Sequence, residues 1–229
     1  MNSHNRFLLA LPELERDSLI DRMSDVDLAC RQVLSEPGNC IEFVYFPETC
    51  VCSILAETAS ILPIEVGMIG FEGVSDFVST YGDTAAFRLL VQVSGRALRI
   101  RAQDFAELAA SLPGLRALTY RYREAMAIQF AYTALAHGSL TIEARLARWL
   151  LMTNDRSRQV AMPLVHEFMA SMLAVRRSGV TTAIHILEGA GAIRASRGSI
   201  VIRDREKLMQ LTAGSYGVPE REYDRLMRT

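Results

Sequence analysis

Short polar side chains follow one another between Arg176 and His185, at spacings that suit hydrogen bonding to nucleic-acid bases. If this stretch is helical, Val180, Ile184 and Leu187 lie within about 60° of one another and form its buried side. The residues predicted to face DNA are Arg176, Arg177, Ser178, Thr181, Thr182 and His185. Because a carboxylate would repel phosphate and none is present among them, the pattern predicts a helix that reads bases in the major groove.

The residues around this helix predict a winged helix-turn-helix. A first helix is expected to begin at Pro163, and a tight turn at Ala174–Arg177 separates it from the second. Residues 193–202 have the pattern of a β-hairpin, the wing. Two further arginines on the wing would reach phosphates, Arg194 and Arg197. The alternative is a helical hairpin beside an ordinary β-hairpin, used to contact protein instead of nucleic acid.

Charge is divided unevenly along the chain, although its 229 residues carry a net charge of only −1. Residues 1–139 contain 11 basic and 17 acidic side chains, a net charge of −6. Residues 140–229 contain 14 basic and 9 acidic side chains, a net charge of +5. A basic segment behind an acidic one indicates that the C-terminal part meets a polyanion, unless the clustering arises by chance.

The remaining elements would hold this site in place. Residues 7–29 repeat their leucines at helical intervals and predict short helices. From Gln32 to about Arg101, short runs rich in Val, Ile, Phe and Thr alternate with Gly and Pro, which predicts an antiparallel sandwich or barrel. The runs expected to form strands are Ile41–Phe46, Cys50–Leu55, Ile61–Ile69, Phe87–Val93 and Ala97–Ile100.

A long stretch from Leu115 to Ala136 without Gly or Pro predicts a single helix that ends near Gly138. Five of its residues recur about every 3.5 positions, as on a coiled-coil seam, and are the candidate dimer interface: Leu118, Tyr122, Ala125, Gln129 and Tyr132. The alternative is a helix that packs the same residues on its own barrel.

These stretches together resemble the Crp-Fnr family of transcription regulators over nearly the whole chain. The resemblance is carried by Ala170–Ala183, Leu187–Ile193 and Arg197–Ile200, and in the N-terminal part by Val44–Glu48 and Glu65–Gly73. It implies an α+β fold: an N-terminal jelly-roll β-barrel of the cyclic-nucleotide-binding type, a long dimerisation helix and a C-terminal winged helix-turn-helix. We therefore expect a sensing barrel at residues 1–112, the dimerisation helix and hinge at 113–138, and a DNA-binding domain at 139–229.

The resemblance also implies partners: double-stranded DNA, a second copy of the chain, and RNA polymerase as a further candidate. The sequence departs from the family where DNA would be read. Many relatives carry an Arg-Glu pair and a second Arg one turn later, whereas this chain has Arg177, Ser178 and Thr182. A different operator is therefore expected. Ala174 replaces the usual turn glycine, and Arg176 replaces a capping serine.

A second departure concerns the effector. Family members that bind cyclic nucleotides need an arginine for the buried phosphate, but the matching loop, Gly82–Phe87, has alanine there and Asp83 beside it. We therefore expect neither cyclic AMP nor cyclic GMP, and we name no effector. The residues that remain candidates for an effector pocket are Glu72, Gly73 and Arg88.

Cofactor, metal and catalytic signals are weak. The four cysteines, Cys30, Cys40, Cys50 and Cys52, do not form the tight N-terminal cluster of iron–sulfur members. Cys50 and Cys52 would share one strand face as reduced thiols, and a redox role for them stays open. The sequence offers no histidine pairing for a metal and no nucleophile–base pair, so we predict neither a metal site nor an enzyme. With no signal peptide and no apolar run of about 20 residues, a cytoplasmic protein is expected.

Overall fold

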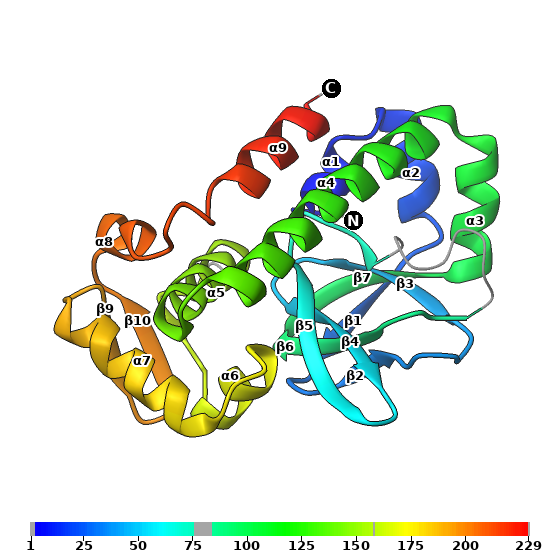
Figure 1. Ribbon diagram of the computed structural model, residues 1–229. Coiled ribbons are helices and arrows are strands. Elements are labelled where there is room, and N and C mark those ends of the chain that lie inside the picture. The colour runs from blue at the N-terminus through cyan, green and yellow to red at the C-terminus, as the bar shows by residue number, and fades with distance from the viewer. Residues whose placement is uncertain (1–2, 76–83, 158, 229) are drawn as a thin grey trace.

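Residues 3–75, 84–157 and 159–228 are described by a computed structural model, and their elements form an α+β fold (Figure 1). The N-terminal half is built on two antiparallel sheets with the strand orders β1-β7-β3 and β2-β6-β4-β5. The helices α1 (Arg6–Leu9) and α2 (Glu13–Ile20) precede the sheets. The strands are β1 (Ser24–Leu28), β2 (Val33–Ser35), β3 (Phe43–Pro47), β4 (Val51–Thr58), β5 (Ile61–Ile69), β6 (Arg88–Val93) and β7 (Gly95–Arg101).

The five predicted strands are present, with limits that differ by a few residues. The short helices predicted in residues 7–29 are present as α1 and α2, but the prediction is wrong for Ser24–Leu28, which form β1. The reason is that β1 is an edge strand with polar residues, so its pairing with β7, from Ser24 opposite Arg99 to Leu28 opposite Gly95, determines its conformation. Local hydrophobic periodicity does not reveal such a strand.

A helical arm follows the sheets: α3 (Ala102–Ser111) and the 27-residue helix α4 (Pro113–Ser139). Pro113 occupies the first turn of α4, where its missing N–H costs nothing. The carboxylate of Glu15 accepts hydrogen bonds from the free N–H groups of Gly114 (3.0 Å) and Leu115 (2.6 Å). At 1.5 Å per residue the helix is about 40 Å long, which confirms the predicted long helix.

The predicted dimer seam on α4 is wrong for four of its five residues. Leu118, Tyr122, Ala125 and Gln129 are buried within the chain's own fold, and Tyr132 is half-buried. Gln129 shows why: its side-chain amide accepts from the Met68 N–H (2.7 Å) and donates to the Met68 carbonyl (3.2 Å). These are the two backbone groups that a neighbouring strand would otherwise pair with. These residues therefore attach α4 to its own barrel.

The C-terminal half places a three-helix unit beside a small sheet, in the order β8-β10-β9. A single apolar cluster joins this half to Val51, Leu55, Met68 and Val93 of the barrel. Its elements are α5 (Ile142–Ser157), β8 (Ala161–Met162), α6 (His166–Met172), α7 (Arg177–Gly189), β9 (Ile193–Ser196), β10 (Ser199–Ile202) and α8 (Arg205–Gln210).

The last helix, α9 (Val218–Met227), returns to the N-terminal half and lies along α4 (Figure 1). Met227 is buried in the core cluster of the barrel, and Tyr223 packs against that cluster. Arg6 of α1 pairs with Asp224 at 2.8 Å. The helix-turn-helix region is therefore attached to the barrel twice: by α4, which precedes it in the sequence, and by α9, which follows it.

Among the described helices, none combines the length and the apolar character needed to cross a bilayer.

Candidate DNA-binding face

A tight turn joins α6 to α7 and sets the angle between them. Ala174 has a positive φ of 49°, the left-handed conformation expected where glycine is usual. The N–H of Val175 donates to the carbonyl of Ala170 (3.0 Å), and Ala170 is buried where the two helices cross. Arg176 precedes α7 without a side-chain cap, as predicted.

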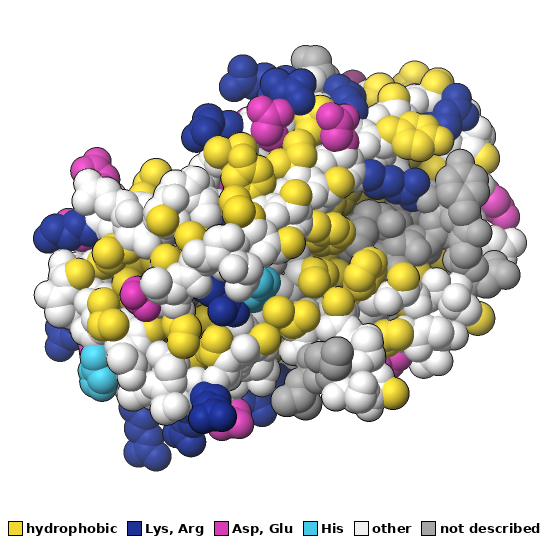
Figure 2. Space-filling model, viewed as in Figure 1, with side chains coloured by type: hydrophobic (Ala, Val, Ile, Leu, Met, Phe, Trp, Pro, Cys, Tyr) yellow, Lys and Arg dark blue, Asp and Glu magenta, His cyan; other side chains and the backbone are white. Residues whose placement is uncertain are grey.

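The helix α7 has the two predicted faces. Val180, Ile184 and Leu187 are at most 2% exposed and pack in the C-terminal core. The polar residues on the other side are exposed to solvent: Arg176, Arg177, Ser178, Thr182 and His185. The exposed hydroxyls of Ser178 and Thr182 meet the condition on which the predicted face depends. Figure 2 shows Lys and Arg side chains along the edge of the molecule below α6 and α7.

Thr181 differs from the other predicted contacts. It is half-buried, and its hydroxyl lies 3.1 Å from Nδ1 of His166. The hydroxyl also donates to the Arg177 carbonyl (3.1 Å), as that of Thr182 does to the Ser178 carbonyl. These contacts engage Thr181 within the fold. His166 was not predicted as a site residue, and its only sequence signal is its place at the start of the first helix.

Two carboxylates lie near this face. The periodicity of the second helix did not reveal them. Glu167 belongs to α6, and its Oε2 lies 4.0 Å from Nη1 of the exposed Arg177. Glu188 lies on α7, accepts from the N–H of Ala195 (2.7 Å) and approaches Nδ1 of His185 (3.9 Å). Glu188 therefore ties α7 to the wing, while Glu167 is an exposed partner that Arg177 would leave on binding an anion.

The wing is the predicted β-hairpin. Ser199 lies opposite Ser196 and Ile202 opposite Ile193, and Gly198 has the positive φ of 75° that the turn requires. Arg194 and Arg197 are exposed. Arg197 borders a groove between α6, α7 and the wing, which Arg177 and His185 also line.

This arrangement is that of a known DNA-binding domain. Residues 144–211 match the family model of the Crp-like helix-turn-helix domain. The C-terminal half of the chain therefore carries a Crp-like helix-turn-helix domain. A comparison of the sequence with curated proteins finds no match.

The fold of the chain is shared with solved structures over most of their length. FixK2 from Bradyrhizobium japonicum has a TM-score of 0.70 and 14% identity, covering 82% of this chain and 96% of that one. The c-di-GMP-responsive regulator CLP of Xanthomonas campestris has a TM-score of 0.67 and 13% identity, covering 83% and 99%. A crp/fnr family regulator from Eubacterium rectale has a TM-score of 0.67 and 13% identity, covering 89% and 95%. At these identities the likeness shows the fold alone.

The structure does not bring together the three residues predicted for an effector pocket. Arg88 pairs with Glu36 (2.9 Å) and Glu57 (3.0 Å). Glu72 instead pairs with Arg156 of α5 at 2.7 Å, in the interior. A Cβ on Gly73 would lie 2.1 Å from the hydroxyl oxygen of Tyr122, so this position has no room for a side chain.

The barrel interior beside Arg88 contains a cavity of only about 10 Å³ among the described residues, room for about one water molecule. Gly82 and Asp83, in the loop expected to lack the phosphate-binding arginine, lie outside the described residues.

The cysteine pair lies where it was predicted. Cys50 and Cys52 are buried in the same core cluster, whereas Cys30 and Cys40 are exposed. The hydrogen bond with Cys50 and the burial of the site raise the pKa of the Cys52 thiol well above its ordinary value. Thiolate chemistry at Cys52 is therefore disfavoured in this fold. In the described part of the chain, His, Cys, Asp and Glu side chains form no group of three that could hold a metal ion.

Proposed function

We propose that the chain is a sequence-specific transcription regulator that binds its operator as a homodimer. The observation that carries the proposal is the division of α7 into a buried apolar stripe and an exposed polar face beside a basic wing. In this geometry Arg177, Ser178, Thr182 and His185 read base edges, because short polar groups and arginine pair with the donors and acceptors of the major groove. Arg176, Arg194 and Arg197 contact phosphates.

A homodimer would present two such helices to successive major grooves about 34 Å apart. The exposed face of α4 supplies a seam for it. Seven residues at alternating spacings of three and four are exposed along this face: Ala117, Tyr120, Glu124, Ala127, Ala131, Ala134 and Gly138. This is the heptad spacing of a coiled coil, and its small residues let two helices approach closely. We propose this face as the dimer interface in place of the buried one.

The test is operator selection followed by substitution of Arg177. After an operator is selected from random duplexes, Arg177→Ala should weaken binding to it by about 1–3 kcal/mol and weaken binding to unrelated DNA less. Arg96→Ala, which removes an exposed arginine of the barrel, is the matched control and should bind like the wild type. Equal operator affinity for Arg177→Ala and wild type would remove Arg177 from the base-reading set.

A broader outcome concerns the function as a whole. If the full chain bound no duplex DNA at low salt, the regulator assignment would fail, and a helix-turn-helix used for protein contacts would be favoured instead. Contact with RNA polymerase stays a prediction that needs a transcription assay.

A further inference from the structure

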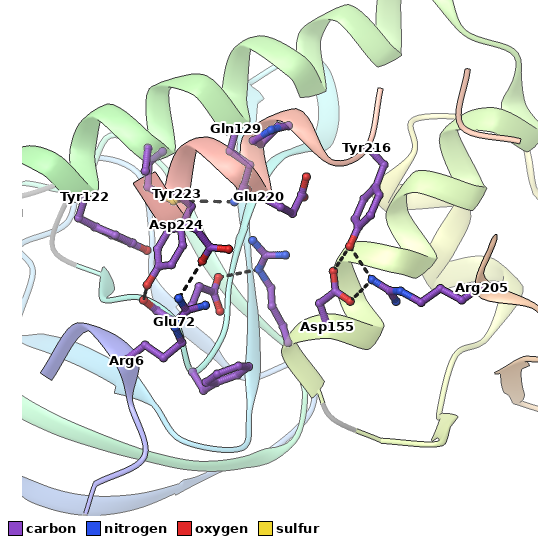
Figure 3. Close-up of a pocket in the computed structure, with 15 residues that line it drawn as sticks. Arg6, Glu72, Tyr122, Gln129, Asp155, Arg205, Tyr216, Glu220, Tyr223 and Asp224 are labelled. Atoms are coloured by element: carbon purple, nitrogen blue, oxygen red, sulfur yellow. Dashed lines mark hydrogen bonds and ion pairs between the residues drawn. The ribbon is translucent and has the colours of Figure 1, made fainter. Parts of the chain in front are cut away.

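A cavity of about 230 Å³ lies where the barrel, α4, α5 and α9 meet, away from the barrel interior (Figure 3). Glu72 contributes from the barrel, Tyr122 and Met126 from α4, Arg156 from α5, and Glu220 and Tyr223 from α9. Its volume is near the lower end of the range for small-molecule sites. Because α9 is not among the elements predicted from the sequence, this cavity could not be predicted either.

Most charges of the cavity wall are already paired with one another. Arg156 Nε donates to Glu72 (2.7 Å), Arg6 pairs with Asp224 (2.8 Å), and Arg205 pairs with Asp155 (2.6 Å). Figure 3 shows the last pair on the far side of the cavity, with the hydroxyl of Tyr216 also on Asp155. These three ion pairs hold the cavity walls together and leave few unpaired charges for a ligand to neutralise.

One carboxylate without an ion pair, Glu220, and one guanidinium with an unused donor, Arg156, remain available to a ligand. Glu220 forms no ion pair among the described residues, and its Oε2 accepts only from the N–H of Gly217 (2.7 Å), which caps α9. Arg156 uses Nε on Glu72 and Nη1 on the Met152 carbonyl (3.1 Å), and no described hydrogen bond uses its Nη2. The two groups are near enough to interact electrostatically: burial disfavours the charged Arg156, but Glu72 and then Glu220 outweigh it and raise its pKa.

We propose that this cavity binds a small α-amino acid with an apolar side chain. The ammonium group would donate to Glu220, and the carboxylate would accept from Nη2 of Arg156. The side chain would lie against Met126 and the rings of Tyr122 and Tyr223, which line the same cavity. The ammonium group thereby meets a carboxylate that lacks an ion pair, and the carboxylate meets an unused guanidinium N–H, so each buried charge of the ligand gains a hydrogen-bonded partner.

A ligand with one charge fits the wall less well. A simple anion would find Arg156 but would lie near the unpaired carboxylate of Glu220. A simple cation would find Glu220 but would lie near the guanidinium of Arg156. Only a ligand with both charges satisfies both groups without leaving one facing a like charge.

The location of the cavity would let such a ligand influence how the barrel and the helix-turn-helix are arranged. It would touch the barrel, the proposed dimer helix α4, the helix α5 that leads into the helix-turn-helix, and the returning helix α9. Binding would therefore hold these elements in the arrangement seen here. This consequence for DNA binding depends on the proposed function, whereas ligand binding itself does not.

The test is isothermal titration calorimetry on the full chain, with leucine, methionine and phenylalanine as probes. For the probe that binds best, the matched amine and the matched carboxylic acid are compared, for example 3-methylbutylamine and 4-methylpentanoate for leucine. The amino acid should bind about tenfold or more tightly than either analogue, because each analogue lacks one charge-assisted hydrogen bond.

A pair of variants tests the assignment of Glu220. Glu220→Gln keeps an acceptor for the cap of α9 but removes the charge. It should lower amino-acid affinity about tenfold and raise the affinity for the carboxylic acid, which no longer lies near a like charge. Glu222→Gln changes a carboxylate of the same helix that pairs with Arg225 outside the cavity, and should bind like the wild type. Thermal unfolding checks that both variants fold.

Three results would overturn the proposal: no saturable heat with any probe up to about 10 mM, equal affinity for the amino acid and one analogue, or unchanged amino-acid affinity in Glu220→Gln. DNA binding is measured separately. Amino-acid binding without any DNA binding would refute the proposed function alone, and operator binding without amino-acid binding would refute this proposal alone.

Discussion

The buried carboxylate of Glu65 links the barrel to the DNA-binding domain. It lies on β5, is 4% exposed, and accepts from the indole N–H of Trp149 on α5 (2.9 Å). Its other oxygen, Oε2, has no hydrogen-bond partner among the described residues. Burial raises its pKa from 4.5 to about 7, although Ser53 and Trp149, and then two arginines, act in the opposite direction. The junction therefore favours a protonated Glu65.

Stability should consequently depend on pH through Glu65. The folded chain holds this proton more tightly than the unfolded chain, so its contribution is fully present below about pH 4.5 and is lost as the pH rises to about 7. The loss is on the order of 3 kcal/mol. Glu65→Gln, which keeps an acceptor for Trp149, should be more stable than the wild type at pH 8 and similar to it at pH 4.5, as measured by urea unfolding.

The control for this measurement is Glu222→Gln, which should keep the pH dependence of the wild type. If Glu65→Gln lost stability at pH 8, the charged form of Glu65 would be the one that the junction favours, and the sign of the effect would be reversed.

At the scale of elements, α4 shows where sequence periodicity is ambiguous. Two sets of residues at heptad-like spacing run along this helix, one starting at Leu118 and one at Ala117. The first contains the larger apolar residues, so it was assigned to the dimer, but a barrel needs the same residues to cover its own core. Alanines give almost no hydrophobic signal, although they suit close helix packing. Only the tertiary structure separates the two faces.

The proposed seam is tested at Ala127, near the middle of the exposed face. Ala127→Arg would place two guanidinium groups against each other across the two-fold axis and should weaken the dimer by about 2 kcal/mol or more. Sedimentation velocity would then show monomer at concentrations where the wild type is dimeric. Ala106→Arg, at an exposed alanine of α3, is the matched control. A dimer unchanged by Ala127→Arg would exclude this face.

The returning helix α9 predicts a dependence of barrel stability on the end of the chain. Met227 is 7% exposed in the barrel core, so Met227→Ala should lower the free energy of unfolding by about 2–4 kcal/mol. Met209→Ala changes a methionine that is 41% exposed on α8 and should stay within about 0.5 kcal/mol of the wild type. Urea titrations compare the two, and equal effects would show that α9 does not support the core.

The elements predicted correctly share a cause. The recognition helix and the wing are determined by residues close in sequence, since Val180, Ile184 and Gly198 act through local periodicity and turn geometry. The site at α9 depends on contacts across the chain, such as Glu72 with Arg156 and Arg6 with Asp224. A polar strand such as β1 likewise depends on its partner. No local pattern encodes these pairings, so the sequence alone did not predict the cavity beside α9.

At the scale of the whole molecule, the division of charge acquires a spatial meaning. The acidic first 139 residues form the barrel and α4, and the basic remainder carries the exposed face of α7 and the wing. A potential of this kind draws DNA to α7 and the wing and away from the barrel, so it orients the encounter before any base is read. Binding that depends on it must weaken with salt, because each neutralised phosphate releases counterions.

The salt dependence therefore separates phosphate contacts from base contacts. Arg194→Ala and Arg197→Ala should each lower the slope of log affinity against log salt by about 2 for a dimer, one per protomer, and should weaken binding to all sequences about equally. Fluorescence anisotropy over a range of salt concentrations measures this slope. Arg96→Ala, on the acidic barrel, should leave the slope unchanged. A loss of sequence preference in the wing variants, without a change in slope, would assign the wing to base reading and leave the phosphate contacts to the ends of α6 and α7.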